Sequence, residues 1–399
     1  MNPIPYSKQH ITDEDIQAVI SVLRSDYLTQ GPKIAEFETA FAAYVGSKYA
    51  VAVANGTAAL HLSALALGIN PGDKVITTPI TFAATANCIR YCGGEVVFAD
   101  IDPETYLLDI NQVRKLLELA PKGTYKGIIP VDFAGRPIDL EAFRKLADEH
   151  GLWIIEDACH APGGYFTDSQ GQIQKCGNGN FADLAIFSFH PVKHIATGEG
   201  GMITTNNEEL YNKLLFLRTH GITRNSQIFS NSIELATGDS KTTSIEYPGW
   251  YMEMQTLGYN FRITDIQAGL GISQLKRSGE GIVRRQEIAQ KYNKVFNNTP
   301  FIESHSGYTN GHAYHLYIIL LKENRLGLYQ FLKANNVYPQ IHYIPCHLMP
   351  YYQEQGYRPG DFKNAEAYYK GCLSIPMYPR LTDNEQEYII NKIHEFFGY

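Results

Sequence analysis

One lysine stands out because of the segment that surrounds it. Lys193 follows the apolar run 184–189 and precedes the glycine-rich turn 198–201. An amine at the end of a buried strand is costly unless it has chemistry to perform. A second apolar run, 152–156, leads directly into Asp157. A lysine that forms a Schiff base and an acid that holds a pyridinium nitrogen are the two protein groups that pyridoxal phosphate requires.

A third segment has the geometry of an anion site. Gly56-Thr57-Ala58-Ala59 follows an apolar run and opens a helical pattern. Such a turn exposes free backbone N–H groups and the positive end of a helix to an anion. Many turns of this kind bind no phosphate, so the motif alone is a weak signal.

Each of these residues also has a structural interpretation. Asp157 could cap a helix and leave His160 at the surface. Phe82, which follows another apolar run, could belong to the core or could stack on an aromatic ring. His190 and His194 have the spacing of a metal pair, but Pro191 interrupts the helix that such a pair needs. We therefore expect no metal site.

Composition excludes several classes of function. The net charge of −7 argues against a nucleic-acid partner and against an anionic membrane surface. No apolar run reaches the roughly 18 residues of a membrane span. The first residues lack the charged and apolar regions of a secretory signal. The six cysteines are scattered, and Cys88 and Cys92 have no second pair nearby, which is typical of reduced thiols in a cytoplasmic protein.

The first half of the chain alternates strand-like and helix-like segments. Seven short apolar runs that mostly do not alternate predict a largely parallel sheet covered on both faces. Ligands of such sheets bind at the carboxyl ends of the strands, where the residues above lie. The runs are 49–54, 74–78, 95–99, 127–131, 152–156, 184–189 and 201–205.

The second half predicts a smaller unit. The polar stretch 226–246 is expected to be an extended loop, and a long helical pattern then covers 264–296 with a break near 278–281. Strands at 313–321 and 337–342 flank a helix at 326–335, which indicates a small α+β domain. We expect residues 1–262 to form the large domain. Residues 263–399 would form the small one, including the long connecting helix.

Five motifs follow one another along the chain. They are Gly56-Thr57-Ala58-Ala59, Thr81-Phe82-Ala83-Ala84-Thr85-Ala86-Asn87, Glu156-Asp157-Ala158-Cys159-His160, Ser188-Phe189-His190-Pro191-Val192-Lys193 with Thr197-Gly198-Glu199-Gly200-Gly201, and Gly258-Tyr259-Asn260-Phe261-Arg262. In this order they resemble the DegT/DnrJ/EryC1/StrS family of sugar aminotransferases, and the resemblance covers essentially the whole chain. It implies the aspartate aminotransferase-like fold, fold type I of pyridoxal-phosphate enzymes.

The resemblance implies a role for each matching residue. Lys193 would form the Schiff base and later move the proton between substrate and cofactor. Asp157 would pair with the pyridine nitrogen, His160 would lie near the phenolic oxygen, and Phe82 would stack on the ring. The phosphate would be held by Gly56, Thr57, Ala58 and Ser188. Asn260 would reach the phosphate site of a neighbouring subunit, which implies a homodimer with shared active sites.

Further segments resemble the family members that act on a UDP-linked 4-keto-6-deoxy-N-acetylhexosamine. They include Leu28-Thr29-Gln30-Gly31 and Gln340-Ile341-His342-Tyr343. By this resemblance glutamate would be the amino donor and the 4-keto carbon of the UDP-sugar the acceptor. The residues that would line the sugar-nucleotide site are Tyr6, Asp26, Tyr27, Leu28, Thr29, Gln340, Ile341, His342 and Tyr343.

Three alternatives stay open. The chain could aminate another nucleotide sugar, such as a dTDP- or GDP-linked 4-keto or 3-keto sugar, because loops set specificity. It could be a cofactor-dependent sugar dehydratase, although those relatives carry histidine where Lys193 stands. It could also be a non-catalytic protein that keeps the fold, which the presence of Lys193, Asp157 and Ser188 disfavours.

Overall fold

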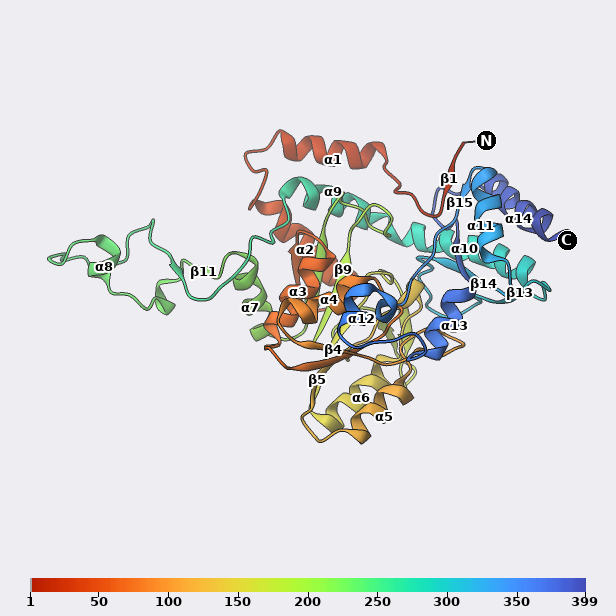
Figure 1. Cartoon of the computed structure of the whole chain (residues 1–399). Coiled ribbons are helices and arrows are strands. Elements are labelled where there is room, and N and C mark those ends of the chain that lie inside the picture. The colour runs from red at the N-terminus through yellow and green to blue at the C-terminus, as the bar shows by residue number, and fades with distance from the viewer. Residues whose placement is uncertain (1) are drawn as a thin grey trace.

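A seven-stranded sheet forms the centre of the large domain in the computed structural model, which describes residues 2–399 (Figure 1). The seven apolar runs are its seven strands, so the predicted α/β fold is confirmed. All neighbours pair in parallel except β10, which is antiparallel to both β2 and β9. The strand order is β2 (Tyr49–Val53), β10 (Gly201–Thr205), β9 (Leu184–Ser188), β6 (Trp153–Asp157), β5 (Tyr125–Ile129), β3 (Lys74–Thr77) and β4 (Glu95–Phe98).

Helices cover both faces of this sheet, and successive residues of a strand enter different cores. Val51 and Val53 pack with α3 (Gly56–Ala66), α4 (Ala83–Tyr91) and α7 (Glu208–Arg218). Ala50 and Ala52 pack on the other face with α2 (Pro32–Val45). Further along that face, Ile154 packs with α5 (Ile110–Leu119) and α6 (Leu140–His150). Burial on both faces explains why these strands lack an alternating polar pattern.

The small domain is a three-stranded antiparallel sheet with helices against it. Its strands are β13 (Ile302–His305), β14 (Tyr317–Leu321) and β16 (Cys372–Ile375), in that order. The expected strand at 337–342 is much shorter: β15 (Val337–Tyr338) pairs with β1 (Ile4–Pro5), and beyond it Gln340 forms a single bridge to Ser374. The other elements of this region are α11 (Arg325–Ala334), α12 (Pro350–Glu354), α13 (Lys363–Gly371) and α14 (Asp383–Phe397).

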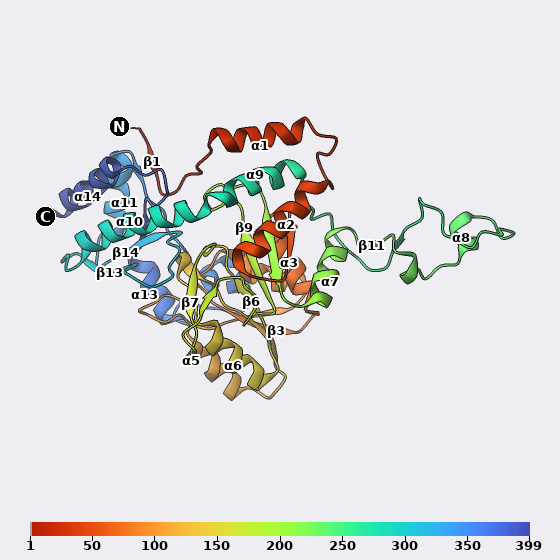
Figure 2. The same ribbon diagram turned by 180° about the vertical axis from the view of Figure 1, so that it is seen from behind.

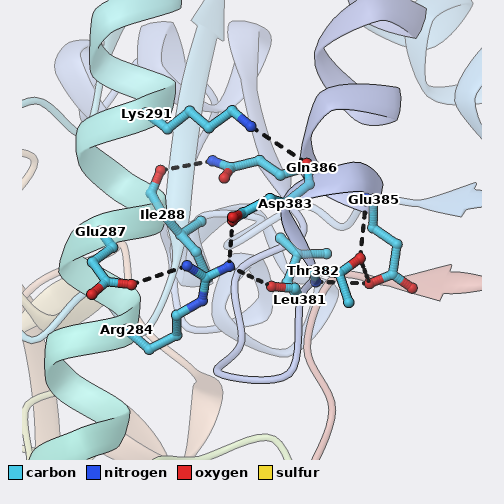
Figure 3. A network of polar contacts seen from close by, with 9 residues as sticks. All are labelled: Arg284, Glu287, Ile288, Lys291, Leu381, Thr382, Asp383, Glu385 and Gln386. Carbon is cyan, nitrogen blue, oxygen red and sulfur yellow. Dashed lines mark hydrogen bonds and ion pairs between the residues drawn. The ribbon is translucent and has the colours of Figure 1, made fainter.

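The long helical pattern forms two helices that join the domains. The break lies at Arg277, between α9 (Asp265–Lys276) and α10 (Ser278–Phe296). α9 packs against α2 and α1 (Asp13–Leu23). In the small domain Arg284 of α10 donates to the Leu381 carbonyl and to the Asp383 carboxylate, at 2.8 and 2.7 Å (Figure 3). The domain boundary at residue 262 remains a prediction.

The polar stretch 226–246 belongs to an arm that extends away from the body (Figures 1 and 2). The arm contains β11 (Ile222–Thr223), α8 (Ile233–Thr237) and β12 (Glu253–Met254). β11 pairs with β12 at its base. A small antiparallel pair, β7 (Tyr165–Thr167) with β8 (Ile173–Lys175), lies in the loop that follows β6. Among residues 2–399, no helix combines the length and the apolar character needed to cross a bilayer.

Candidate active site

A cavity of about 450 Å³ opens at the carboxyl ends of the central strands. It collects residues from β6, β9, the start of α3 and two segments outside the sheet. The carboxyl ends of parallel strands meet at one edge, which is why residues far apart in sequence meet here. Its lining includes Tyr6, Asn55, Gly56, Thr57, Thr81, Phe82, Thr85, Asp157, Cys159, His160, Ser188, Val192, Lys193, Glu199, His342 and Tyr343.

Asp157 is the buried acid of the cavity and is held by two donors. Its Oδ2 accepts a hydrogen bond from Thr85 Oγ1 at 2.7 Å, and its Oδ1 accepts one from the Cys159 amide at 3.2 Å. Because the Thr85 hydroxyl donates to Asp157, its oxygen accepts from Thr81 Oγ1 at 2.8 Å. The two threonines therefore fix the orientation of the carboxylate. Thr85 was not among the site residues predicted from the sequence, although the Thr81–Thr85 spacing at the start of a helix signals such a pair.

Lys193 stands in a turn that its own backbone closes. Its amide donates to the His190 carbonyl at 2.8 Å, and the Thr197 amide donates to the Phe189 carbonyl at 2.9 Å. Burial lowers the pKa of the Lys193 amine, while Cys159 and Asp157 act in the opposite direction. A lowered pKa increases the fraction of neutral amine, the form that attacks a carbonyl carbon.

The amino end of α3 and the end of β9 form a narrow recess. A Cβ added at Gly56 would lie 3.0 Å from the Ser188 Cβ, so only glycine leaves this space open. Asn55 caps the helix and accepts from the Ala58 amide at 2.8 Å. The Ala58 N–H is thus already used, and Ala58 itself does not line the cavity. Gly56, Thr57 and Ser188 do line it.

His160 has a defined tautomer because of its two neighbours. The Ala134 amide donates to His160 Nδ1 at 3.2 Å, so the ring hydrogen lies on Nε2. His160 Nε2 is 3.2 Å from the Tyr343 hydroxyl oxygen and donates to it. Burial, which is the larger cause, and then the charge of Lys193 hold the pKa of His160 well below its usual range, so the ring stays neutral. The Tyr343 hydroxyl is then free to donate its own hydrogen.

The residues predicted to bind substrate separate into two groups. Tyr6, His342 and Tyr343 line the cavity, whereas Gln340 and Ile341 do not. The backbone at His342 is fixed by a hydrogen bond, because Tyr368 Oη donates to the His342 carbonyl at 2.6 Å. The exposed residues Asp26, Tyr27, Leu28, Thr29 and Asn260 do not line the cavity of their own chain.

Two exposed residues of the second group pair with other segments of the chain. Thr29 forms a β-bridge with Thr264, and Asn260 forms one with Thr219. Asp265 accepts from the Gly31 amide at 2.7 Å and thereby fixes the end of the 26–31 loop. Phe82, by contrast, lines the cavity with 62% of its surface exposed, so one ring face is available for stacking.

The model of the DegT/DnrJ/EryC1/StrS aminotransferase family matches residues 9–394. The chain belongs to this family. The spore coat polysaccharide biosynthesis protein SpsC of Bacillus subtilis is 40% identical over 98% of this chain and 96% of that protein.

Among solved structures, Helicobacter pylori PseC, an aminotransferase of pseudaminic acid biosynthesis, has a TM-score of 0.86 and 29% identity, with both chains fully covered. The pyridoxal-phosphate form of the putative sugar aminotransferase Spr1654 from Streptococcus pneumoniae has a TM-score of 0.84. It is 28% identical over 99% of this chain and 98% of that one.

Membership of the family establishes a pyridoxal-phosphate-dependent aminotransferase, and the cavity fits this cofactor. The recess at Gly56 and Ser188 admits an anion beside a helix terminus. Lys193 supplies an amine with a lowered pKa, and Asp157 supplies a buried carboxylate fixed by Thr85. The DegT-family fold of this chain thus brings the amine, the acid and the anion recess to one cavity.

Proposed function

We propose that the chain transfers the amino group of glutamate to the 4-keto carbon of a UDP-linked 4-keto-6-deoxy-N-acetylhexosamine. The products would be UDP-4-amino-4,6-dideoxy-N-acetyl-β-L-altrosamine and 2-oxoglutarate, formed in the cytoplasm. The supporting observation is one cavity that holds Lys193, Asp157 and the sugar-side residues Tyr6 and Tyr343. The likeness to PseC over the full length of both chains supports the choice of sugar.

In this proposal the cofactor supplies a carbonyl carbon that takes up the amine and a ring that accepts electrons. Asp157 would hold a proton on the ring nitrogen. Gly56, Thr57 and Ser188 would bind the phosphate. Phe82 would stack on the ring and exclude water from it.

Lys193 is the group that moves protons. Its Nζ would take up the proton that the α-carbon of glutamate loses and would move it within the cavity, and the reverse transfer would serve the sugar. Both halves use one site in turn, so we expect ping-pong kinetics. The Tyr343 hydroxyl, whose hydrogen His160 leaves free, is placed to donate to an oxygen in the cavity.

A second candidate is amination of a different nucleotide sugar. It is favoured by the 40% identity to SpsC, which is higher than the 29% identity to PseC. The fold and the Lys193–Asp157 pair are compatible with either sugar, because they act on the cofactor. The residues that differ between the two candidates would be those facing the sugar.

We expect the purified enzyme to aminate the UDP-linked 4-keto sugar and to leave dTDP- and GDP-linked 4-keto sugars largely unchanged. The measurement is a panel of the three substrates with glutamate, followed by mass and stereochemical analysis of the products. A panel without enzyme and one without glutamate are the controls. Amination of the dTDP-sugar alone would establish the second candidate in place of the first.

We also propose a homodimer in which each chain completes the site of the other. Asn260 and the 26–29 loop do not line their own cavity, and they are exposed. The arm next to them carries exposed apolar side chains that a single chain leaves in water, a pattern typical of an interface. These are Ile228, Leu235, Ile245, Trp250, Met252, Met254 and Leu257.

Mixing two inactive variants tests the shared site. Lys193→Ala and Asn260→Ala each damage both sites of their own homodimer. In a mixed dimer one site has neither residue, while the other has both. Random exchange of subunits should therefore restore up to about a quarter of the wild-type activity. The control is Lys193→Ala alone, taken through the same exchange procedure. If the mixture of the two variants gains no activity, Asn260 acts in the site of its own chain.

A further inference from the structure

Three buried ionisable side chains form a cluster next to Asp157 in the chain but outside the lining of the cavity. Asp132, Glu156 and Cys176 are exposed by only 0%, 1% and 2%, and one ligand-type atom from each lies within 4.8 Å of the others. Glu156 immediately precedes Asp157 in β6. Successive side chains of a strand point to opposite faces, so Glu156 points away from the face that Asp157 occupies.

The two carboxyl groups lack a cation. Asp132 Oδ1 accepts from the Ile138 amide at 2.9 Å, and the two oxygens of Glu156 accept from the Gly177 amide at 2.9 and 3.0 Å. Asp132 Oδ2 is buried and has no donor among residues 2–399. No lysine or arginine of the same residues forms an ion pair with either carboxylate.

An oxygen of Asp132 and an oxygen of Glu156 nevertheless lie within 4.8 Å of each other. One of them can donate to the other only if a carboxyl group keeps its hydrogen, because ionised carboxylates only accept. Two buried like charges without a cation would also be very costly. One retained proton removes both problems.

The backbone of Asp132 is joined to the active site. Its amide donates to the Asp157 carbonyl at 3.1 Å, and the Asp157 amide donates to the Pro130 carbonyl at 2.9 Å. Two residues further along, the Ala134 amide donates to His160 Nδ1 and so fixes that tautomer. The 130–134 segment therefore positions both the acid and the histidine of the cavity.

We propose that Asp132 and Glu156 share one proton, and that this carboxyl–carboxylate pair positions Asp157 and His160 for the cofactor. The roles of Asp157 and His160 rest on the proposed function; the shared proton does not. Burial and then mutual repulsion raise the pKa of Glu156 well above its usual range, and burial raises that of Asp132 to about 6. The other titratable groups that act on the pair are Asp157 from β6 and Cys176 after β8.

The first test is thermal unfolding of the cofactor-loaded enzyme against pH. In the unfolded chain Glu156 ionises near its ordinary pKa of about 4.3. Above that pH the pair binds one more proton in the folded state than in the unfolded state, so its contribution to wild-type stability falls with rising pH. The Glu156→Gln variant needs no proton. We expect its Tm to exceed that of the wild type by a gap that widens from about pH 4.5 upward and is largest at pH 8.

Asp15→Asn is the matched control because Asp15 is also buried but has donors. Its carboxylate accepts from the Thr12 amide at 3.0 Å, from Gln274 at 2.7 Å and from Arg277. Burial raises the pKa of Asp15, but hydrogen bonds from Ser273, Thr12 and Arg277 outweigh it and lower the pKa overall. The ionised form is therefore stabilising above the ordinary pKa, and Asp15→Asn should have a lower Tm at pH 8. The two variants should thus change Tm in opposite directions.

The second test asks whether the pair positions the site. Glu156→Leu cannot form the hydrogen bond, whereas Glu156→Gln can. We expect Glu156→Leu to bind pyridoxal phosphate about tenfold more weakly than the wild type, and Glu156→Gln to bind it with the wild-type affinity. The measurement is titration of the apoenzyme with the cofactor. Infrared spectra of the wild type should contain a protonated-carboxyl C=O band at pH 8 that Glu156→Gln lacks.

Three outcomes would overturn the proposal. The carboxyl band could be absent at pH 8, or Glu156→Gln could be less stable than the wild type at every pH. The purified enzyme could also contain a stoichiometric metal ion that Glu156→Gln loses, in which case the three groups would be a metal site. Failure of catalysis in the substrate panel would leave the Tm and infrared results unaffected.

Discussion

Replacing Lys193 by alanine should abolish turnover while leaving the fold intact. Lys193 is the amine of the cavity, and burial lowers the pKa that controls its reactivity. We expect kcat to fall by more than about 10⁴-fold, because general acid–base catalysis alone contributes about 10²–10⁴-fold. The measurement is the rate of 2-oxoglutarate formation, accompanied by the visible absorbance of the bound cofactor.

A lysine outside the cavity provides the comparison. Lys322 donates to the Pro300 carbonyl at 2.6 Å in the small domain and does not line the cavity. Lys322→Ala should keep the wild-type rate. Equal rates for Lys193→Ala and the wild type would remove Lys193 from the mechanism.

Asp157→Asn should have the second-largest effect. Asparagine keeps the shape of the side chain but lacks the negative charge that, in the proposed mechanism, would hold a proton on the ring nitrogen. Loss of such a fixed electrostatic partner costs about 10²–10³-fold in kcat. The variant should still bind the cofactor through Gly56, Thr57 and Ser188, so kcat and cofactor affinity need separate measurements.

Thr85→Val offers a graded version of the same test. It leaves the charge of Asp157 in place and removes one hydrogen bond, at 2.7 Å, that orients the carboxylate. A hydrogen bond to a charged group is worth about 1.5–3 kcal/mol, so an effect of about tenfold or more is expected, smaller than that of Asp157→Asn. An effect of Thr85→Val equal to that of Asp157→Asn would mean that orientation, and not charge, is the contribution of Asp157.

Local patterns predicted the large domain well because each strand carries its own signal. Each of the seven apolar runs could be recognised as a strand without knowing which strand it pairs with, and the order of the motifs indicated the family. The fold of the small domain was harder, because the expected strand 337–342 reduces to Val337–Tyr338. Its pairing partner is Ile4–Pro5, more than three hundred residues away in sequence, and no local pattern encodes that contact.

The site residues divide in the same way. Lys193 and Asp157 each follow an apolar run, and the structure brings both to one cavity. The hydrogen bond from Thr85 to Asp157 joins α4 to β6, and the bond from Ala134 to His160 joins two loops. Such contacts depend on the distance between elements in the folded chain. The same holds for Ala58, whose N–H is taken by Asn55 and not left for an anion.

The exposed arm has a thermodynamic consequence for the cofactor. If two chains associate through its apolar side chains and Asn260 then completes the phosphate site of the partner, as proposed, cofactor binding and association are linked equilibria, because each favours the other. The apparent affinity for pyridoxal phosphate would then rise with the concentration of the protein itself. On dilution the enzyme would lose cofactor at the same concentration at which the dimer dissociates, although neither Lys193 nor Asp157 belongs to the arm.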